Sequence, residues 1–226
     1  MPEYPDITIY IERLEALVIG HPLEQIRFAG PFFLRTAQPH TKTINGAMVR
    51  SIDRIGKRIV FEFDRERFLV IHLMVAGRLH WRKKACRLPG KVGLAVFDFP
   101  NNSLLITEAG TKNRASLHLI NGRDERAGLD PGGLEVFEAS LDEFRSTLLA
   151  ENHTLKRSLT DPRIFSGIGN TYSDEILHRA RLRNCRSTDS LCLQRDQLLP
   201  IVPNRRKNSC RPGHVATTEK GLAPHP

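Results

Sequence analysis

The chain has 226 residues, of which 40% are hydrophobic, and its formal net charge is +9 at pH 7. This length and apolar content permit one large or two modest hydrophobic cores. The positive charge favours a polyanionic partner, with nucleic acid ahead of an anionic membrane surface. No apolar run is long enough to cross a bilayer and no secretory signal is visible, so we expect an intracellular, reduced protein.

The cysteines do not have the spacing of a metal site. None of the four stands in the CxxC arrangement of a zinc ribbon; they are Cys86, Cys185, Cys192 and Cys210. A disulfide framework and a structural zinc are both disfavoured. The cysteine spacing therefore predicts no metal site.

A helix is predicted over residues 5–19, because Ile7, Leu14 and Val18 recur at helical spacing. Gly20 and Pro22 end it. Since the helix begins almost at Pro2, the first residues should be held at a helix N-terminus and should not form a loose tail.

From about residue 24 to 120 the hydrophobic pattern shortens to that of strands separated by Gly, Pro, Asn and charged residues. This pattern predicts an antiparallel sandwich or barrel. Residues 121–133 are polar and rich in glycine, which is typical of a linker. Helical patterns return within 140–159 and 171–182.

The predicted fold class is therefore α+β, with an N-terminal antiparallel β-sandwich over 1–120, a linker over 121–133 and a helical domain over 134–182. Residues 183–226 have little periodicity and many Arg, Ser and Pro residues. We expect at most one weak helix there and otherwise disorder. Without a partner from this tail, Ile176 and Leu177 on the last predicted helix would be exposed.

The start of the chain carries the first candidate site. If Met1 is removed, Pro2 presents a secondary α-amine, which titrates near ~8 instead of the ~10.4 of a lysine side chain. Such an amine can attack an aldehyde carbon and form a Schiff base. Glu3 places a carboxylate beside it for proton transfer. The alternative is that Pro2 only opens a helix and Glu3 only complements its dipole.

The fragment FSGIGN carries the second candidate. Gly167 and Gly169 let the backbone turn sharply and aim N–H groups at an anion. Asn170 can cap the following helix or donate to a phosphate. Lys156 lies one helix upstream, within plausible reach of the same phosphate. An ordinary glycine turn between two helices is the alternative.

The third candidate is Lys57, which follows Gly56 at the tip of a predicted hairpin. A lysine on a rigid hairpin tip can enter a DNA groove. A lysine on a strand face is merely solvated, and by itself the motif favours this second reading.

In this order and spacing the segments resemble the formamidopyrimidine-DNA glycosylase and endonuclease VIII family of base-excision repair enzymes. The resemblance covers residues 1–182. The motifs that carry it are MPEYPDI, Gly56-Lys57, the strand from His72-Leu73 to Gly77, Asp130-Pro131, and LKRSLTDPRIFSGIGNTYSDEILHRARL.

The resemblance implies a β-sandwich followed by a helix–two-turn–helix domain, with damaged double-stranded DNA bound in a basic cleft between them. It implies a bifunctional glycosylase and AP lyase that uses no cofactor, acts as a monomer and is found in the cytoplasm or on the nucleoid. By this resemblance Pro2 is the nucleophile at C1′, Glu3 moves protons, and Lys57 donates a proton and contacts phosphate. Lys156 and Asn170, with the turn at Gly167 and Gly169, would hold the phosphates beside the lesion.

Three departures from the family pattern concern DNA binding. Family members fill the gap left by the flipped base with a methionine, an arginine and a phenylalanine. Here Met74 is displaced by one strand position, and Val75 stands in its place. Lys112 can replace the arginine charge, and Arg114, a planar group that can stack on a base, stands where the aromatic wedge is expected.

The end of the chain is the third departure, because residues 183–226 supply no CxxC pairs for the family's zinc finger. The helical domain therefore looks incomplete. This leaves an alternative function, a catalytically impaired or inactive DNA-binding remnant of the family. A weaker alternative is an RNA- or ribosome-associated protein, since basic helices and glycine turns also suit RNA phosphates.

Overall fold

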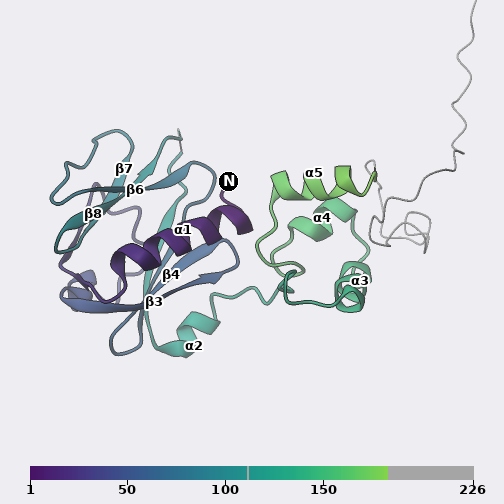
Figure 1. The fold of residues 1–226 in the computed structure, drawn as a ribbon, viewed down its shortest axis with the longest axis horizontal. Helices are drawn as coiled ribbons and strands as arrows, with labels where there is room; N and C mark the ends of the chain where they lie inside the picture. Colours follow the sequence, from purple (N-terminus) through teal and green to yellow (C-terminus); the bar gives the residue numbers. More distant parts are fainter. Residues whose placement is uncertain (111, 183–226) are drawn as a thin grey trace, which may run out of the picture.

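The computed structural model describes residues 1–110 and 112–182, which form two lobes (Figure 1). The larger lobe is a sandwich of two antiparallel sheets with strand orders β1-β3-β4-β5-β9 and β2-β7-β8-β6. The strands are β1 Pro22–Leu23, β2 Gln25–Phe28, β3 Ala47–Ile55, β4 Arg58–Phe63, β5 Arg67–His72, β6 Gly77–Lys83, β7 Gly93–Asp98, β8 Asn102–Glu108 and β9 Ser116–Asn121. The predicted α+β class with an N-terminal antiparallel sandwich is confirmed.

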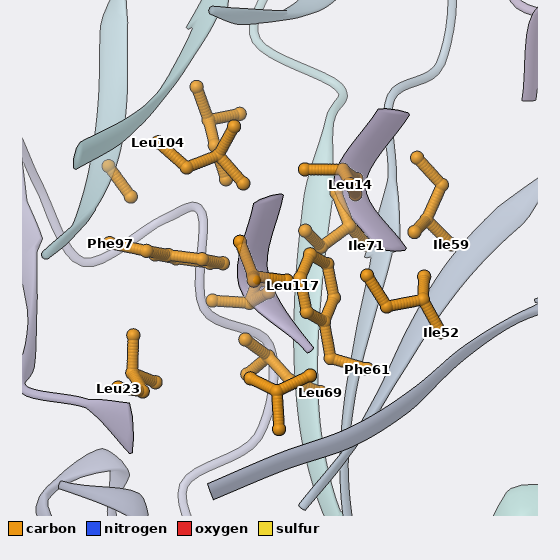
Figure 2. Close-up of a cluster of buried hydrophobic side chains, with 14 of the residues drawn as sticks. Leu14, Leu23, Ile52, Ile59, Phe61, Leu69, Ile71, Phe97, Leu104 and Leu117 are labelled. Carbon is orange, nitrogen blue, oxygen red and sulfur yellow. The ribbon is translucent and has the colours of Figure 1, made fainter. Parts of the chain in front are cut away.

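The core of this lobe lies between the sheets and is completed by helix α1 (Tyr4–Val18), which packs against β3 and β4. Figure 2 shows Phe61, Ile71 and Leu117 of the five-stranded sheet facing Phe97 and Leu104 of the other. The alternation of β-strands sends every second side chain inward, so these residues meet although they are distant in sequence. A short 3₁₀ helix, Thr41–Ile44, lies between β2 and β3.

The outer face of the five-stranded sheet is also covered, by a helix that lies in the predicted linker. Residues 121–133 were predicted to be a linker, and no helix was expected in them; they contain helix α2 (Gly122–Ala127), which packs on β5 and β9. Leu129 joins a second apolar cluster with Phe68 and Val70 on the same face. Polar composition alone does not reveal this helix, because none of its own residues is buried.

The smaller lobe contains α3 (Leu141–Leu149), α4 (Leu155–Thr160) and α5 (Asn170–Arg179). Their apolar cluster includes the fully buried Phe165 together with Leu155, Leu159 and Leu177. Leu177 is buried and belongs to this cluster, contrary to the expectation, whereas Ile176 is 36% exposed. The predictions for residues 183–226 lie outside the described part of the chain.

Candidate active site between the two lobes

Glu3 lies where the two lobes meet, and its carboxylate is buried at the N-terminus of α5. Oε2 accepts the backbone N–H groups of Gly169 at 2.7 Å and Tyr172 at 3.1 Å, and Oε1 accepts that of Thr171 at 2.9 Å. The side chain is 1% exposed. The first N–H groups of a helix have no partner within it, and the helix dipole favours a negative charge there. Glu3 therefore supplies the cap of a helix that begins 167 positions later in the chain.

The glycines of FSGIGN are required by this contact. A Cβ on Gly169 would stand 2.6 Å from Cδ of Glu3, and one on Gly167 would stand 2.9 Å from Cδ2 of Tyr4. Gly167 also has φ +80°, a conformation that favours glycine. Tyr4 N–H in turn donates to the Gly167 carbonyl at 3.0 Å. The turn is thus built to receive the first residues of the chain.

This geometry alters one sequence-based expectation. The N–H groups of the turn were predicted to face a phosphate, but the anion at Gly169 is the carboxylate of Glu3. Gly169 is also the N-cap of α5, and Asn170 is the first residue of this helix. Asn170 therefore does not cap the helix, as it was predicted to do. Asn170 is exposed, so its amide remains available to an external acceptor.

Pro2 is buried beside Glu3 with Met1 in place. The N–H of Glu3 donates to Oδ2 of Asp6 at 2.9 Å, which closes the first turn of α1 around the start of the chain. Pro2 and Glu3 are therefore held at the N-terminus of a helix, as the sequence predicts.

Lys57 lies in the hairpin between β3 and β4, and its side chain extends to the glycine turn that Glu3 also binds. Gly56 takes φ +57° in the two-residue turn, which favours glycine at this position. Lys57 Nζ donates to the carbonyl of Ile168 at 2.8 Å. Burial lowers the pKa of Lys57, and the negative charge of Glu3 opposes this change. A lysine with a lowered pKa gives up a proton more readily, which suits a proton donor.

Lys156 lies on α4 and its ammonium pairs with Asp174 of α5, with Nζ 2.6 Å from Oδ1. Both side chains are exposed, so the pair contributes little to stability and can open toward a phosphate. Lys156 and Asn170 are brought to adjoining helices, since α4 packs against α5.

Met74 lies in a turn that follows β5, which ends at His72, and it has φ +53°. The expectation that Met74 and Val75 are strand positions is therefore wrong. Gly77 N–H closes the turn on the Leu73 carbonyl at 3.0 Å, and a Cβ on Gly77 would stand 2.2 Å from that oxygen. Val75 is 56% exposed at the tip.

The loop before β9 is anchored by Glu108, which is 2% exposed. Its carboxylate accepts the N–H of Arg114 at 3.0 Å and that of Ala115 at 3.1 Å. The side chains of Lys112 and Arg114 are exposed. Gly110 approaches Ala76, since a Cβ on it would lie 3.8 Å from that of Ala76. The structure thus brings this loop beside the turn of Met74 and Val75.

Sequence patterns did not identify Arg54, Glu135 and Ser166, which form a polar network between the lobes. Arg54 donates to Ser166 Oγ at 3.2 Å and pairs with the Glu135 carboxylate, and Ser166 Oγ donates to Glu135 Oε1 at 2.6 Å. Their positions in the sequence could have identified two of these residues, because Ser166 lies inside FSGIGN and Arg54 lies just before the Gly56 turn. No pattern connects them to Glu135.

Within residues 1–110 and 112–182, no three His, Cys, Asp or Glu side chains are grouped to hold a metal ion. Cys185, Cys192 and Cys210 lie outside those ranges. No helix in the described ranges combines the length and hydropathy that a membrane span requires.

Comparison with known proteins agrees with this architecture. The model of the formamidopyrimidine-DNA glycosylase N-terminal domain matches residues 1–113. The chain is 30% identical over 199 residues to the formamidopyrimidine-DNA glycosylase of Heliobacterium modesticaldum, which covers 84% of this chain and 72% of that protein. It is 28% identical over 203 residues to the enzyme of that name from Mycoplasma genitalium, covering 88% and 71%.

Two solved structures show the same fold. A complex between the Lactococcus lactis Fpg and DNA containing an abasic site superposes with a TM-score of 0.76 at 21% identity, covering 87% of this chain and 72% of that one. MutM in complex with DNA containing carbocyclic 8-oxo-G superposes with a TM-score of 0.77 at 21% identity, covering 87% and 75%.

Proposed function

The chain belongs to the formamidopyrimidine-DNA glycosylase family, and on that premise we propose that it excises oxidised bases from DNA as a bifunctional glycosylase and AP lyase. The observation that carries the proposal is the convergence of three separate segments on one point. Glu3 beside Pro2 binds the glycine turn at Gly169, and Lys57 binds the adjacent Ile168 carbonyl.

In the proposed reaction, the free amine of Pro2 attacks C1′ of the damaged nucleotide, and the bond from C1′ to the base breaks. The base leaves with a proton. Protonation of O4′ opens the sugar ring and leaves an iminium between Pro2 and C1′. Glu3, held beside Pro2, moves these protons. Loss of a proton from C2′ then breaks the C3′–O3′ bond, which cuts the strand, and water releases the amine.

The substrate must leave the base stack to reach Pro2, which costs least where the base pair is already weakened. Phosphates on either side of the lesion would bind Lys156 and Asn170, and Lys57 would donate a proton and contact phosphate. Lys112, Arg114 and Met74 would contact the DNA near the vacated position. The basic character of the chain supports this polyanionic partner.

Borohydride trapping on a duplex with one abasic site tests the proposal, because only an amine nucleophile leaves a stable covalent adduct. The chain from which Met1 has been removed should form the adduct. A form that retains Met1 should not, since its Pro2 nitrogen is an amide. Pro5→Ala, which changes a proline in the first turn of α1, is the matched control and should still be trapped.

The alternative functions predict different results from the same assay. An inactive remnant would bind the duplex without forming an adduct, and an RNA-associated protein would prefer RNA to the abasic duplex. Full trapping by the form that retains Met1 would refute Pro2 as the nucleophile.

A further inference from the structure

Arg54 makes an unusual set of contacts at the junction of the lobes. One guanidinium nitrogen donates to the Gly56 carbonyl at 2.7 Å and to Ser166 Oγ at 3.2 Å, and the other pairs with Glu135. Its Cζ lies 4.1 Å from the centroid of the Tyr4 ring. The side chain is only 14% exposed. A planar, forked donor can satisfy all these partners at once, and a lysine ammonium cannot.

Three of the four partners of Arg54, all except Glu135, are adjacent in sequence to a residue of the candidate site. Gly56 precedes Lys57, Tyr4 follows Glu3, and Ser166 precedes Gly167. A Cβ on Gly167 would lie 3.4 Å from Arg54, so the turn packs directly against the guanidinium. Three segments that are distant in sequence thus converge on one side chain.

Glu135 ties this network to the connection between the lobes. Leu134, the residue before it, donates to the Ile164 carbonyl at 2.9 Å and accepts from Ser166 N–H at 2.9 Å. The carboxylate of Glu135 then binds both Arg54 and Ser166 Oγ. Because Arg54 belongs to the sandwich and Ser166 to the helical lobe, the network fixes one lobe against the other.

We propose that Arg54, held by Glu135 and Ser166, is the positioning residue that aligns Lys57 with Pro2 and Glu3 across the two lobes. Its side chain is largely buried against these partners, so it acts through the segments that it holds. The inference rests on the proposed function. It predicts that the chemical step suffers more than DNA binding when Arg54 is changed.

Arg126 offers a matched control on the outer face of the sandwich. It pairs with Asp53 at 3.1 Å, and its Cζ lies 5.3 Å from the Phe68 ring centroid. It therefore has the same combination of an ion pair and a cation–π contact as Arg54. Neither Asp53 nor Phe68 belongs to the candidate site.

The test compares Arg54→Lys, Arg54→Ala and Arg126→Ala in two measurements. The first is the Kd for a duplex with a tetrahydrofuran abasic analogue, which cannot form a Schiff base. The second is the single-turnover rate of borohydride trapping on a true abasic site at saturating protein. Both Arg54 variants should lower the trapping rate on the order of 100-fold with little change in Kd, because small misplacements of reacting groups cost that much. Arg126→Ala should leave both unchanged.

The pH dependence of the trapping rate distinguishes a positioning role of Arg54 from a purely structural role, which would leave it unchanged. Loss of Arg54 should hydrate the Gly56–Lys57 turn and return the pKa of Lys57 toward its ordinary value, since burial is what lowers it. The basic limb of the profile should therefore move to higher pH in the Arg54 variants and stay in place in Arg126→Ala.

Should Arg54→Ala fail to fold, the gentler Glu135→Gln and Ser166→Ala decide the matter, and both should slow trapping without weakening binding of the analogue. Wild-type trapping rates in these variants, or an equal loss of trapping rate in Arg126→Ala, would refute the role of Arg54 but not the proposed function. Absence of trapping by the native chain would instead refute the proposed function, and the inference would fall with it.

Discussion

The two lobes are held together in different ways. The sandwich closes a large apolar core between two sheets and α1, and the residues of this core all lie within 7–119. Within residues 134–182 the apolar cluster around Phe165 is much smaller, and the glycine turn beside it is bonded to Glu3, Lys57 and Arg54 of the sandwich. The part of the helical lobe nearest the candidate site therefore depends on hydrogen bonds from the sandwich. Four predictions test this difference.

Removing a core phenylalanine from each lobe should have the largest effect. Phe97 is 1% exposed in the sandwich and Phe165 is 0% exposed in the helical lobe. Each change to Ala should cost about 3–5 kcal/mol. Phe97→Ala should lower the free energy of global unfolding, whereas Phe165→Ala should raise amide hydrogen exchange over 134–182 and leave the strands protected. An equal loss of protection in the strands of Phe165→Ala would show that the lobes unfold as one unit.

Glu3→Ala should come next, because it leaves three backbone N–H groups at the start of α5 without their acceptor. We expect a loss of about 2–3 kcal/mol, seen as faster exchange over 164–172 and not in the sandwich. Glu3→Gln retains one acceptor oxygen and should lose less stability. If Glu3→Ala left exchange in that segment unchanged, the bonds from Glu3 would not be what holds the turn.

Acid should weaken the sandwich through His72. Burial, with the nearby charges of Arg58, Lys57 and His118, lowers the pKa of His72 to about 4 from 6.5. The unfolded chain then takes up a proton below pH 6.5 that the folded chain refuses until about pH 4, so stability is lost as pH falls through this window.

Between pH 7 and pH 5 this histidine should cost the sandwich about 2 kcal/mol in urea unfolding. His72→Gln should flatten that part of the pH dependence. A wild-type slope in His72→Gln would assign the effect to other groups, with His118, whose pKa is also lowered by burial, as the first to examine.

The smallest effect should come from the exposed pair of Lys156 and Asp174. If Lys156 contacts one phosphate, Lys156→Ala should reduce the slope of log K against log salt by about one unit, on lesion and undamaged duplex alike. Asp174→Asn frees the lysine and should tighten binding slightly. A change confined to lesion discrimination would show that Lys156 reads the base and not the phosphate.

Local patterns were sufficient to predict most elements. The helix over 5–19 appears as Tyr4–Val18, and the strands over 24–120 form the predicted antiparallel sandwich. Hydrophobic periodicity and glycine turns are properties of neighbouring residues, so they can be read without knowing the fold. The family motifs likewise lie within short segments. The roles assigned to Pro2 and Lys57 remain predictions.

The contacts between segments required the tertiary structure. Only the fold shows that the carboxylate of Glu3 occupies the N–H groups at Gly169, that Met74 lies in a turn, and that Arg54 joins Gly56 to Ser166. Helix α2 was missed for a similar reason, because the sheet face that it covers is built from distant strands. The sequence by itself determined most of the elements, the family resemblance and the candidate chemical groups. Which groups meet was decided by the path of the chain, since partners such as Arg54 and Glu135 lie 81 positions apart and no local pattern encodes their contact.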